Sequence, residues 1–372
     1  MMSHFIKTIK INSFRGIRSL QLDDIQQINI LTGDNNSGKT SVLEILENFG
    51  KSDDVWAWES LLRIENRTPV PWGSSVYDGF YNLFDIDSDN KIVEYSISTL
   101  NETVTVALKA KIVEEELTEA EYSYVTGVSY NYSGEEKEVD NSILYPVTKM
   151  ELETSINGTV CDTIEVYEGQ RRYRIGRANR KISEPKIIYV SPTRHAEGNL
   201  YLSEILNNPE LYEELLAVLK EYDEDIISIN YDNDDNITSG RGVYKILSRT
   251  HKRALPLNVY GDGMKKAVLL MSAVIKAQNG VLLLDEFETA IHTSAMDRTF
   301  KWILETCRKL NVQVFMTSHS KEAIDKVLKC SPSSLKNMVV FTLYKDDIGS
   351  SVRRLSGEKA IEAQDDMGLE LR

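Results

Sequence analysis

The chain has few cysteines, no long apolar run and no excess of positive charge. The cysteines among its 372 residues are Cys161, Cys307 and Cys330, which are far apart. This spacing provides neither a disulfide framework nor a Cys/His metal cluster, so we expect a reducing, cytoplasmic environment. No stretch approaches the ~18 apolar residues of a membrane span, and residues 1–7 lack an apolar signal region. We therefore expect no membrane anchor.

The charge balance and the hydrophobic pattern exclude further classes. The formal net charge is −14 at pH 7, so any contact with nucleic acid must come from a local basic patch rather than from the overall field. No heptad pattern persists for even about three repeats, which argues against long coiled-coil arms. Internal repeats and low-complexity tracts are also missing. The composition fits an α/β chain of one or two domains.

The most informative segment that is present runs from Gly33 to Thr40. It reads Gly-Asp-Asn-Asn-Ser-Gly-Lys-Thr, between the apolar run 28–31 and a helical pattern from Ser41 to Leu46. Glycines let backbone N–H groups curl around a phosphate, and the helix N-terminus adds positive potential. Lysine reaches the terminal phosphates and threonine ligates Mg²⁺ in such loops. The segment predicts a nucleoside triphosphate site formed by Gly33, Asn35, Asn36, Ser37, Gly38, Lys39, Thr40 and Ser41.

A second motif predicts hydrolysis. Residues 281–284 are Val-Leu-Leu-Leu, which is typical of a parallel strand buried on both faces. The run leads into Asp285 and Glu286 at the carboxyl edge, where open α/β sheets bind ligands. We expect Asp285 to hold Mg²⁺ together with Thr40, and Glu286 to orient the attacking water. A strand that merely ends in solvated acids is the alternative.

A histidine ends the next apolar strand. Residues 312–316 are followed by Thr-Ser-His-Ser at 317–320. His319 is thereby predicted to lie at the same edge as Asp285 and Glu286, where it would contact the γ-phosphate or the water. A lone histidine is more often structural, but its position favours a functional role.

Residues 9–46 resemble the N-terminal signature of ABC-type ATPases related to RecF, Rad50 and the OLD (overcoming lysogenisation defect) proteins. Residues 12–16, Asn-Ser-Phe-Arg-Gly, match the family's Asn-Phe-Arg-Gly-like strand, and the phosphate loop follows. The Asp-Glu strand, the Glu-x-x-x-His segment ending at His292 and the Thr-Ser-His-Ser tip look most like the OLD branch. The resemblance covers about the first fifty and the last hundred and twenty residues. It implies an α/β P-loop NTPase of ABC-ATPase type that uses ATP and Mg²⁺, with ATP between the subunits of a homo-oligomer.

Two further family motifs are less clear. The signature loop, which reaches the other subunit's γ-phosphate in the family, has its candidate at Gly261 and Gly263, just before the apolar helix 267–277. This stretch departs from Leu-Ser-Gly-Gly-Gln, and a flexible turn is the alternative. The family's glutamine loop has no matching glutamine. Asn82 lies nearer the expected place than Gln170, but we assign it no role.

The middle of the chain predicts an insertion. Period-two runs at 92–97, 103–108, 122–132 and 162–167 predict an antiparallel β lobe, with turns at Asn157-Gly158 and Ser133-Gly134. Residues 202–222 read as helices. We therefore divide the chain into a nucleotide-binding core (1–50 and 245–372), an inserted mainly β lobe (51–198) and a helical subregion (199–244).

One basic segment contrasts with the acidic background. Residues 171–181 include Arg171, Arg172 and Arg174, which could clamp phosphates beside Tyr173. A solvated hairpin and a protein dock remain alternatives to nucleic-acid binding. Arg194, after the strand 187–190, could approach the nucleotide, although a turn is the simpler interpretation.

Full-length OLD proteins continue into a Toprim nuclease domain. This chain ends at Arg372, and the acidic pairs Asp234-Asp235 and Asp365-Asp366 are expected in loops or the tail. We therefore expect a separate Toprim-type nuclease or toxin partner, in bacterial or phage-encoded defence. The alternatives are an ATP-dependent scaffold or sensor with little turnover and a RecF-like DNA repair ATPase. A transporter ATPase fits poorly because of the signature loop.

Overall fold

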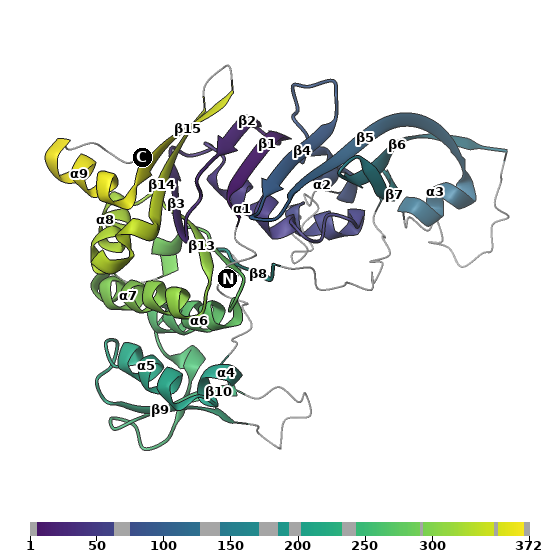
Figure 1. The fold of residues 1–372 in the computed structure, drawn as a ribbon. Coiled ribbons are helices and arrows are strands. Elements are labelled where there is room, and N and C mark those ends of the chain that lie inside the picture. Colours follow the sequence, from purple (N-terminus) through teal and green to yellow (C-terminus); the bar gives the residue numbers. More distant parts are fainter. Residues whose placement is uncertain are drawn as a thin grey trace.

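The computed structural model describes residues 6–62, 75–126, 142–170, 185–192, 202–232, 243–290, 293–345 and 349–367. A six-stranded, mainly parallel sheet lies between two layers (Figure 1). On one face it packs against helix α1 and an antiparallel sheet, and on the other against a layer of helices. No helix in these ranges is long and apolar enough to span a membrane.

The central sheet has the strand order β15-β14-β3-β13-β12-β8 and is parallel except for β15. Its strands are β3 (Ile28–Gly33), β8 (Ile187–Val190), β12 (Val281–Leu284), β13 (Gln313–Thr317), β14 (Met338–Lys345) and β15 (Ser350–Ser356). The inner strands β3, β12 and β13 are buried throughout, which is why their sequences are continuous apolar runs. The strands expected at the phosphate loop, at the acidic pair and at the histidine are confirmed.

The antiparallel sheet has the order β2-β1-β4-β5-β6-β7. It consists of β1 (Thr8–Phe14), β2 (Ile17–Leu22), β4 (Ile92–Ser98), β5 (Thr103–Thr118), β6 (Leu144–Ile156) and β7 (Thr159–Tyr167). The N-terminal hairpin therefore shares one sheet with the strands of the middle segment. The turn at Asn157-Gly158 is confirmed, with φ values of 50° and 79°.

One predicted strand is wrong. The period-two run at 122–132 is occupied, as far as the structure describes it, by helix α3 (Glu119–Thr126). The Glu121 carboxylate accepts hydrogen bonds from the backbone N–H and the hydroxyl of Thr118 at 2.9 and 2.7 Å. This Thr-x-x-Glu arrangement is a capping box, a helix-start signal that outweighs the alternation of tyrosines. The expected turn at Ser133-Gly134 lies outside the described residues.

Helices cover both faces of the central sheet. On the antiparallel-sheet side lie α1 (Lys39–Asn48), η1 (Val55–Leu61) and α2 (Val76–Tyr81); the opposite side carries α6 (Asp262–Lys276), η4 (Phe287–Ala290), α7 (Thr293–Lys309), α8 (Lys321–Cys330), η5 (Pro332–Asn337) and α9 (Gly357–Met367). Asp365 and Asp366 therefore lie in a helix rather than in a loop. Asp365 pairs with Lys329 of α8 at 3.0 Å on the surface, while Ala360 of α9 is buried in the core.

A small subregion packs against α6. It contains α4 (Ser203–Leu206), α5 (Pro209–Leu219), β9 (Ile226–Asp232), β10 (Val243–Ser248), β11 (Leu255–Pro256) and η3 (Leu257–Val259). The helices agree with the expectation for residues 202–222, and Asn208 caps α5 by accepting the N–H groups of Glu210 and Leu211. The three-stranded sheet was not anticipated. The division into core, lobe and subregion stays a prediction. Strand β8, which lies within the predicted lobe (51–198), pairs with β12 of the central sheet.

Candidate nucleotide-binding site

The phosphate loop joins β3 to α1 in a conformation that requires glycine. Gly33 and Gly38 have φ values of 134° and 98°. A Cβ atom at Gly33 would lie 2.3 Å from the carbonyl oxygen of Leu343, and one at Gly38 would lie 2.9 Å from Cδ1 of Ile17. The loop is thus pressed between β14 and β2, and both glycines are needed for its shape.

The first turn of α1 is open to an anion. The first N–H groups of a helix have no partner within the helix. Gly38, the residue before α1, supplies no side-chain hydrogen bond to them. Asn35 and Asn36 are exposed, whereas Ser37 and Ser41 are buried beside them. Free N–H groups at a helix N-terminus form a site for a phosphate.

Lys39 is buried within the loop. Its Nζ donates hydrogen bonds to the carbonyl oxygens of Gly33 and Asp34 at 2.8 and 2.7 Å. Burial lowers the pKa of Lys39, while the nearby carboxylates of Asp285 and Asp34 oppose this shift. The cation is therefore held next to the helix N-terminus, where the predicted phosphates would lie.

Asp285 is the centre of a hydroxyl cluster. Its Oδ1 accepts the hydroxyl of Thr317 at 2.5 Å and that of Thr40 at 3.2 Å. Its Oδ2 accepts the hydroxyl of Tyr189 at 3.2 Å. The structure thus brings together Thr40 and Asp285, which the sequence proposed as metal ligands. It adds Tyr189 and Thr317, which the sequence analysis missed; their signal was that each stands at the carboxyl end of a strand beside β12.

Tyr189 is a neutral donor in this cluster. Burial raises the pKa of its hydroxyl, and the charge of Asp285 raises it further, with smaller effects from Glu44 and Glu47. The hydroxyl therefore stays protonated and donates to the carboxylate.

Glu286 stands in an unusual backbone conformation. Its φ is 45°, a region that costs a residue with a side chain roughly 1–3 kcal/mol and often marks functional sites. Its N–H donates to the hydroxyl oxygen of Thr317 at 2.8 Å, and its carbonyl accepts the N–H of Thr289 at 2.9 Å. These contacts fix the turn that follows β12, in which Glu286 is half-buried.

His319 is held through its backbone. Its N–H donates to Oε1 of Glu288 at 2.7 Å, and the N–H of Ser320 donates to the same atom at 3.2 Å. Glu288 thereby connects the segment after β12 to the start of α8. His319 is half-buried at the end of β13, as expected. His292, the other histidine of the family-like pattern, lies outside the described residues.

The two signature-loop glycines differ. Gly261 is exposed, and no atom lies within 4 Å of an added Cβ. Gly263 packs against the ring of Tyr222, which an added Cβ would approach to 3.2 Å. Lys266, one turn into α6, donates to the carbonyl of Thr289. Gly263 thus has a packing role, while Gly261 presents an open helix N-terminus.

Asn82, to which the sequence assigns no role, and the end of β8 occupy different places in the structure. Asn82 follows α2 and lines a pocket of about 470 Å³ that includes Arg15 and Lys345. Strand β12 has β8 as its neighbour on the side away from β13. The N–H of Asp285 donates to the carbonyl of Val190, the last residue of β8, at 2.9 Å. The end of β8 is therefore adjacent to the acidic pair.

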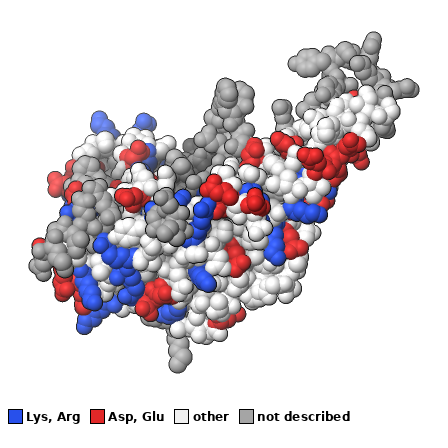
Figure 2. Space-filling view, turned by 90° about the horizontal axis from the view of Figure 1, so that it is seen from above, with Lys and Arg blue, Asp and Glu red and all other residues white. Residues whose placement is uncertain are grey.

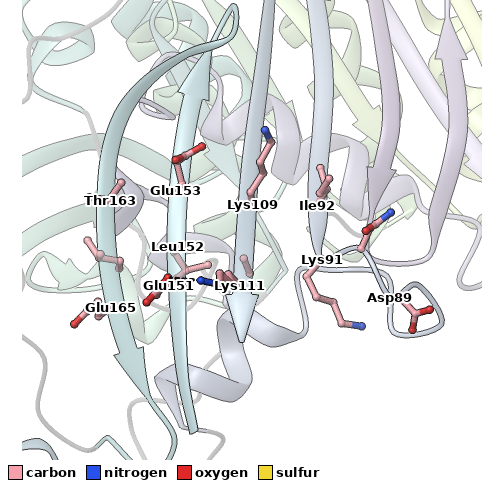
Figure 3. Close-up of a pocket in the computed structure, with 13 residues that line it drawn as sticks. Asp89, Lys91, Ile92, Lys109, Lys111, Glu151, Leu152, Glu153, Thr163 and Glu165 are labelled. Carbon is pink, nitrogen blue, oxygen red and sulfur yellow. Dashed lines mark ion pairs between the residues drawn. The ribbon is translucent and has the colours of Figure 1, made fainter. Parts of the chain in front are cut away.

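A larger pocket, of about 830 Å³, lies on the antiparallel sheet. Figure 3 shows charged side chains of β5, β6 and β7 along it, with Lys111 beside Glu151 at 3.8 Å. Lys109 stands opposite Glu153 in the ladder. The positive and negative side chains that line this pocket compensate one another, so we do not assign the pocket to the nucleotide.

The charge pattern of one face of the molecule bears on the predicted contact with nucleic acid. Basic and acidic side chains are interspersed over the face shown in Figure 2. The predicted basic segment with Arg171, Arg172 and Arg174 lies outside the described residues, as does Arg194. Nucleic-acid binding through this segment stays a prediction.

Two family models match the chain. One, described as "AAA ATPase domain", matches residues 5–121, and the other, described as "AAA domain, putative AbiEii toxin, Type IV TA system", matches residues 167–325. They cover the phosphate loop and the acidic pair respectively. Together with the site geometry, these matches support a protein that binds and hydrolyses ATP and is similar to ABC-type ATPases of the RecF/Rad50 group.

The chain is also similar to particular proteins and to solved structures. An "ATP/GTP phosphatase" of Helicobacter pylori is 25% identical over 376 residues, which cover 92% of this chain and 93% of the relative. A "DNA replication and repair protein RecF" of Idiomarina loihiensis is 41% identical over 64 residues, 17% of this chain and 18% of that protein. Among solved structures, an Smc head bound to the C-winged helix domain of ScpA aligns over 96% of this chain and 99% of that one, with a TM-score of 0.49 and 12% identity.

Proposed function

We propose that two copies of this ATPase enclose ATP and Mg²⁺ between them, and that the bound nucleotide controls the activity of a separate effector protein. The observation that carries this proposal is the exposed N-terminus of α6, where Gly261 has open space around it. A helix N-terminus of this kind attracts phosphate. It supplies the part of the site that a second copy would bring to the phosphate loop of the first.

The oxygen donors fit a magnesium ion. Thr40 Oγ1 and Asp285 Oδ1 are 3.2 Å apart, and hydroxyl and carboxylate oxygens are ligands that Mg²⁺ accepts beside phosphate oxygens. In the proposal Thr40 and Asp285 hold the ion. It would neutralise charge that develops on the phosphates.

The remaining residues have complementary roles in the proposal. Lys39 moves from the loop carbonyls to the phosphates, and Glu286 orients the attacking water. His319, which follows β13 beside β12, contacts the γ-phosphate or the water in this proposal. Each role follows from the element that positions the residue: α1 for Lys39, the turn after β12 for Glu286 and the end of β13 for His319.

We further propose that the effector is a nuclease or toxin on another chain, acting in anti-phage defence. The family model over residues 167–325 names a toxin and a toxin–antitoxin system in its description, which supports this setting. A scaffold that holds its effector with little turnover is the second candidate. A test is to purify the tagged native protein from its host and identify what accompanies it with ATP and with ADP; an effector retained equally in both states favours the scaffold.

Mixing two inactive variants tests the shared site. Lys39→Ala removes the phosphate-loop cation, and Gly261→Glu places a carboxylate at the open N-terminus of α6. If the site is shared, each variant alone is inactive, but a mixed dimer has one intact site. An equimolar mixture should regain roughly a quarter of the parental rate, because half of the dimers are mixed and half of their sites are intact.

Two controls make this result decisive. Gly261→Ala, in the same open space, should keep most of the parental activity. Mixing Lys39→Ala with Glu286→Gln should restore nothing, because both changes affect the same half of the site. A mixture of Lys39→Ala and Gly261→Glu that stays inactive, although size measurements show mixed dimers, would contradict the shared site.

A further inference from the structure

Tyr189 stands next to the predicted metal site, although neither the motifs nor the comparisons assign it a role. It is the third residue of β8, and β8 pairs in parallel with β12, where Tyr189 is opposite Leu283. Since strand residues alternate in direction, Asp285 lies on the same side as Leu283 and Tyr189, and the long tyrosine side chain reaches it past the strand end. Its hydroxyl donates to Oδ2 at 3.2 Å.

The two oxygens of Asp285 are held from different sides. Oδ1 is held by Thr40 and Thr317, as described above, and Oδ2 by Tyr189. A carboxylate held at one oxygen alone can still rotate about its Cβ–Cγ bond. The Tyr189 hydroxyl gives the second oxygen a partner as well.

The surroundings of Tyr189 reinforce this role. Glu44 and Glu47 of α1 are buried, with 6% of each exposed, and their charges act on the Tyr189 hydroxyl. Glu44 is paired with Arg15 at 2.8 Å.

We propose that Tyr189 is a positioning residue for the metal ion: it orients the Asp285 carboxylate so that the ion binds between Asp285 and Thr40. This inference rests on the proposed Mg²⁺ site. Partners of a metal-binding carboxylate that do not touch the ion typically affect metal affinity about 10–100-fold, so the effect should be measurable without turnover.

The test is Tyr189→Phe, which removes the hydroxyl and keeps the ring. Nucleotide affinity is measured with a fluorescent ATP analogue in EDTA, and Mn²⁺ affinity of the protein–ATP-analogue complex by electron paramagnetic resonance. We expect nucleotide affinity in EDTA to stay within about twofold and Mn²⁺ affinity to fall about tenfold. The hydrolysis rate should recover at high Mg²⁺ concentration.

Matched variants exclude a general packing effect. Tyr95→Phe removes the hydroxyl of a fully buried tyrosine on β4, whereas Tyr189 is partly buried, and should leave Mn²⁺ affinity unchanged. In an Asp285→Asn background, Tyr189→Phe should have little further effect on Mn²⁺ binding, since the two residues act through one contact.

Several outcomes would overturn the inference. One is an unchanged Mn²⁺ affinity in Tyr189→Phe, and another is a loss of nucleotide affinity in EDTA as large as the loss of Mn²⁺ affinity. If the parent protein binds the nucleotide but gains nothing from Mn²⁺ or Mg²⁺, the proposed metal site itself fails, and the inference fails with it.

Discussion

The hydroxyl of Thr317 donates to Asp285 at 2.5 Å and at the same time accepts the backbone N–H of Glu286 at 2.8 Å. One side chain at the end of β13 thus fixes both acidic residues at the end of β12. The proposed metal ligand and the proposed water-orienting residue share this support. Their relative position therefore depends on a neighbouring strand and not only on the turn that joins them.

Replacing Thr317 should reduce hydrolysis more than binding. Thr317→Val removes both hydrogen bonds with little change in volume. A hydrogen bond to a charged group contributes about 1.5–3 kcal/mol, so kcat should fall roughly 10–100-fold. Thr317→Ser keeps the hydroxyl and should retain most of the activity. Equal rates for the valine and serine variants would show that the support is dispensable.

Substitutions of Lys39 and of Glu286 should impair different steps, nucleotide binding and hydrolysis respectively. Lys39→Ala removes the buried cation from the phosphate loop and should abolish ATP binding, measured by equilibrium titration. Glu286→Gln should keep binding and retain unhydrolysed ATP, because only the orientation of the water is lost. If Glu286→Gln hydrolyses ATP at the parental rate, the assignment of the water-orienting residue is wrong.

The charge of Lys39 predicts a pH dependence. Burial lowers the pKa of Lys39 below the ordinary value of 10.5, and only the protonated amine attracts phosphate. ATP affinity should therefore be constant while the lysine is protonated and fall as the pH rises through the lowered pKa, earlier than for a solvent-exposed lysine. In Lys39→Arg, any remaining affinity should lose this dependence, because the guanidinium stays charged. An identical alkaline profile in the arginine variant would assign the titration to another group.

The sequence predicted those parts of the fold that local pattern determines. Continuous apolar runs identified β3, β12 and β13, and the phosphate loop was recognised from its glycines and lysine. The proximity of Thr40 and Asp285, separated by 245 positions, followed from the rule that parallel strands share a carboxyl edge. These predictions need only the residues within one element and a general rule of sheet topology.

The contributions of Tyr189 and Thr317 could not be predicted in the same way. Each depends on which strands flank β12, and the order β13-β12-β8 arises from pairings between distant segments. The helix α3 was misread because its start signal, Thr118 and Glu121, competes with an alternating pattern. The strands β9 and β10 were missed because few of their residues are buried, so no buried apolar run marks them, and β11 has only two residues.

Alanine substitutions of Gly33 in the phosphate loop, Gly169 after β7 and Gly261 before α6 should differ in their effect on the free energy of unfolding. Gly33→Ala forces a side chain into a φ of 134° and against the carbonyl of Leu343, so the free energy of unfolding should fall by at least about 1–3 kcal/mol. Gly169→Ala, at a φ of 74° with no atom within 4 Å, should show the backbone cost alone. Gly261→Ala has neither problem and should be close to neutral. Chemical denaturation of the three variants checks this order, and a Gly33→Ala protein as stable as the parent would contradict the described loop.

The last prediction is that the purified chain does not cut nucleic acid. Among the described residues, no group of three or more His, Cys, Asp or Glu side chains is placed to hold a metal ion. The proposed ion at Thr40 and Asp285 serves the nucleotide. The net charge of −14 also opposes unspecific binding, which depends on neutralising phosphates with lysine and arginine. Incubation with DNA and Mg²⁺ or Mn²⁺ should therefore leave the DNA intact.

If DNA is bound at all, binding should weaken with salt and with substitution of Arg171, Arg172 and Arg174. Degradation that persists in Asp285→Ala would reveal a second metal site, because that variant disables the nucleotide-associated ion.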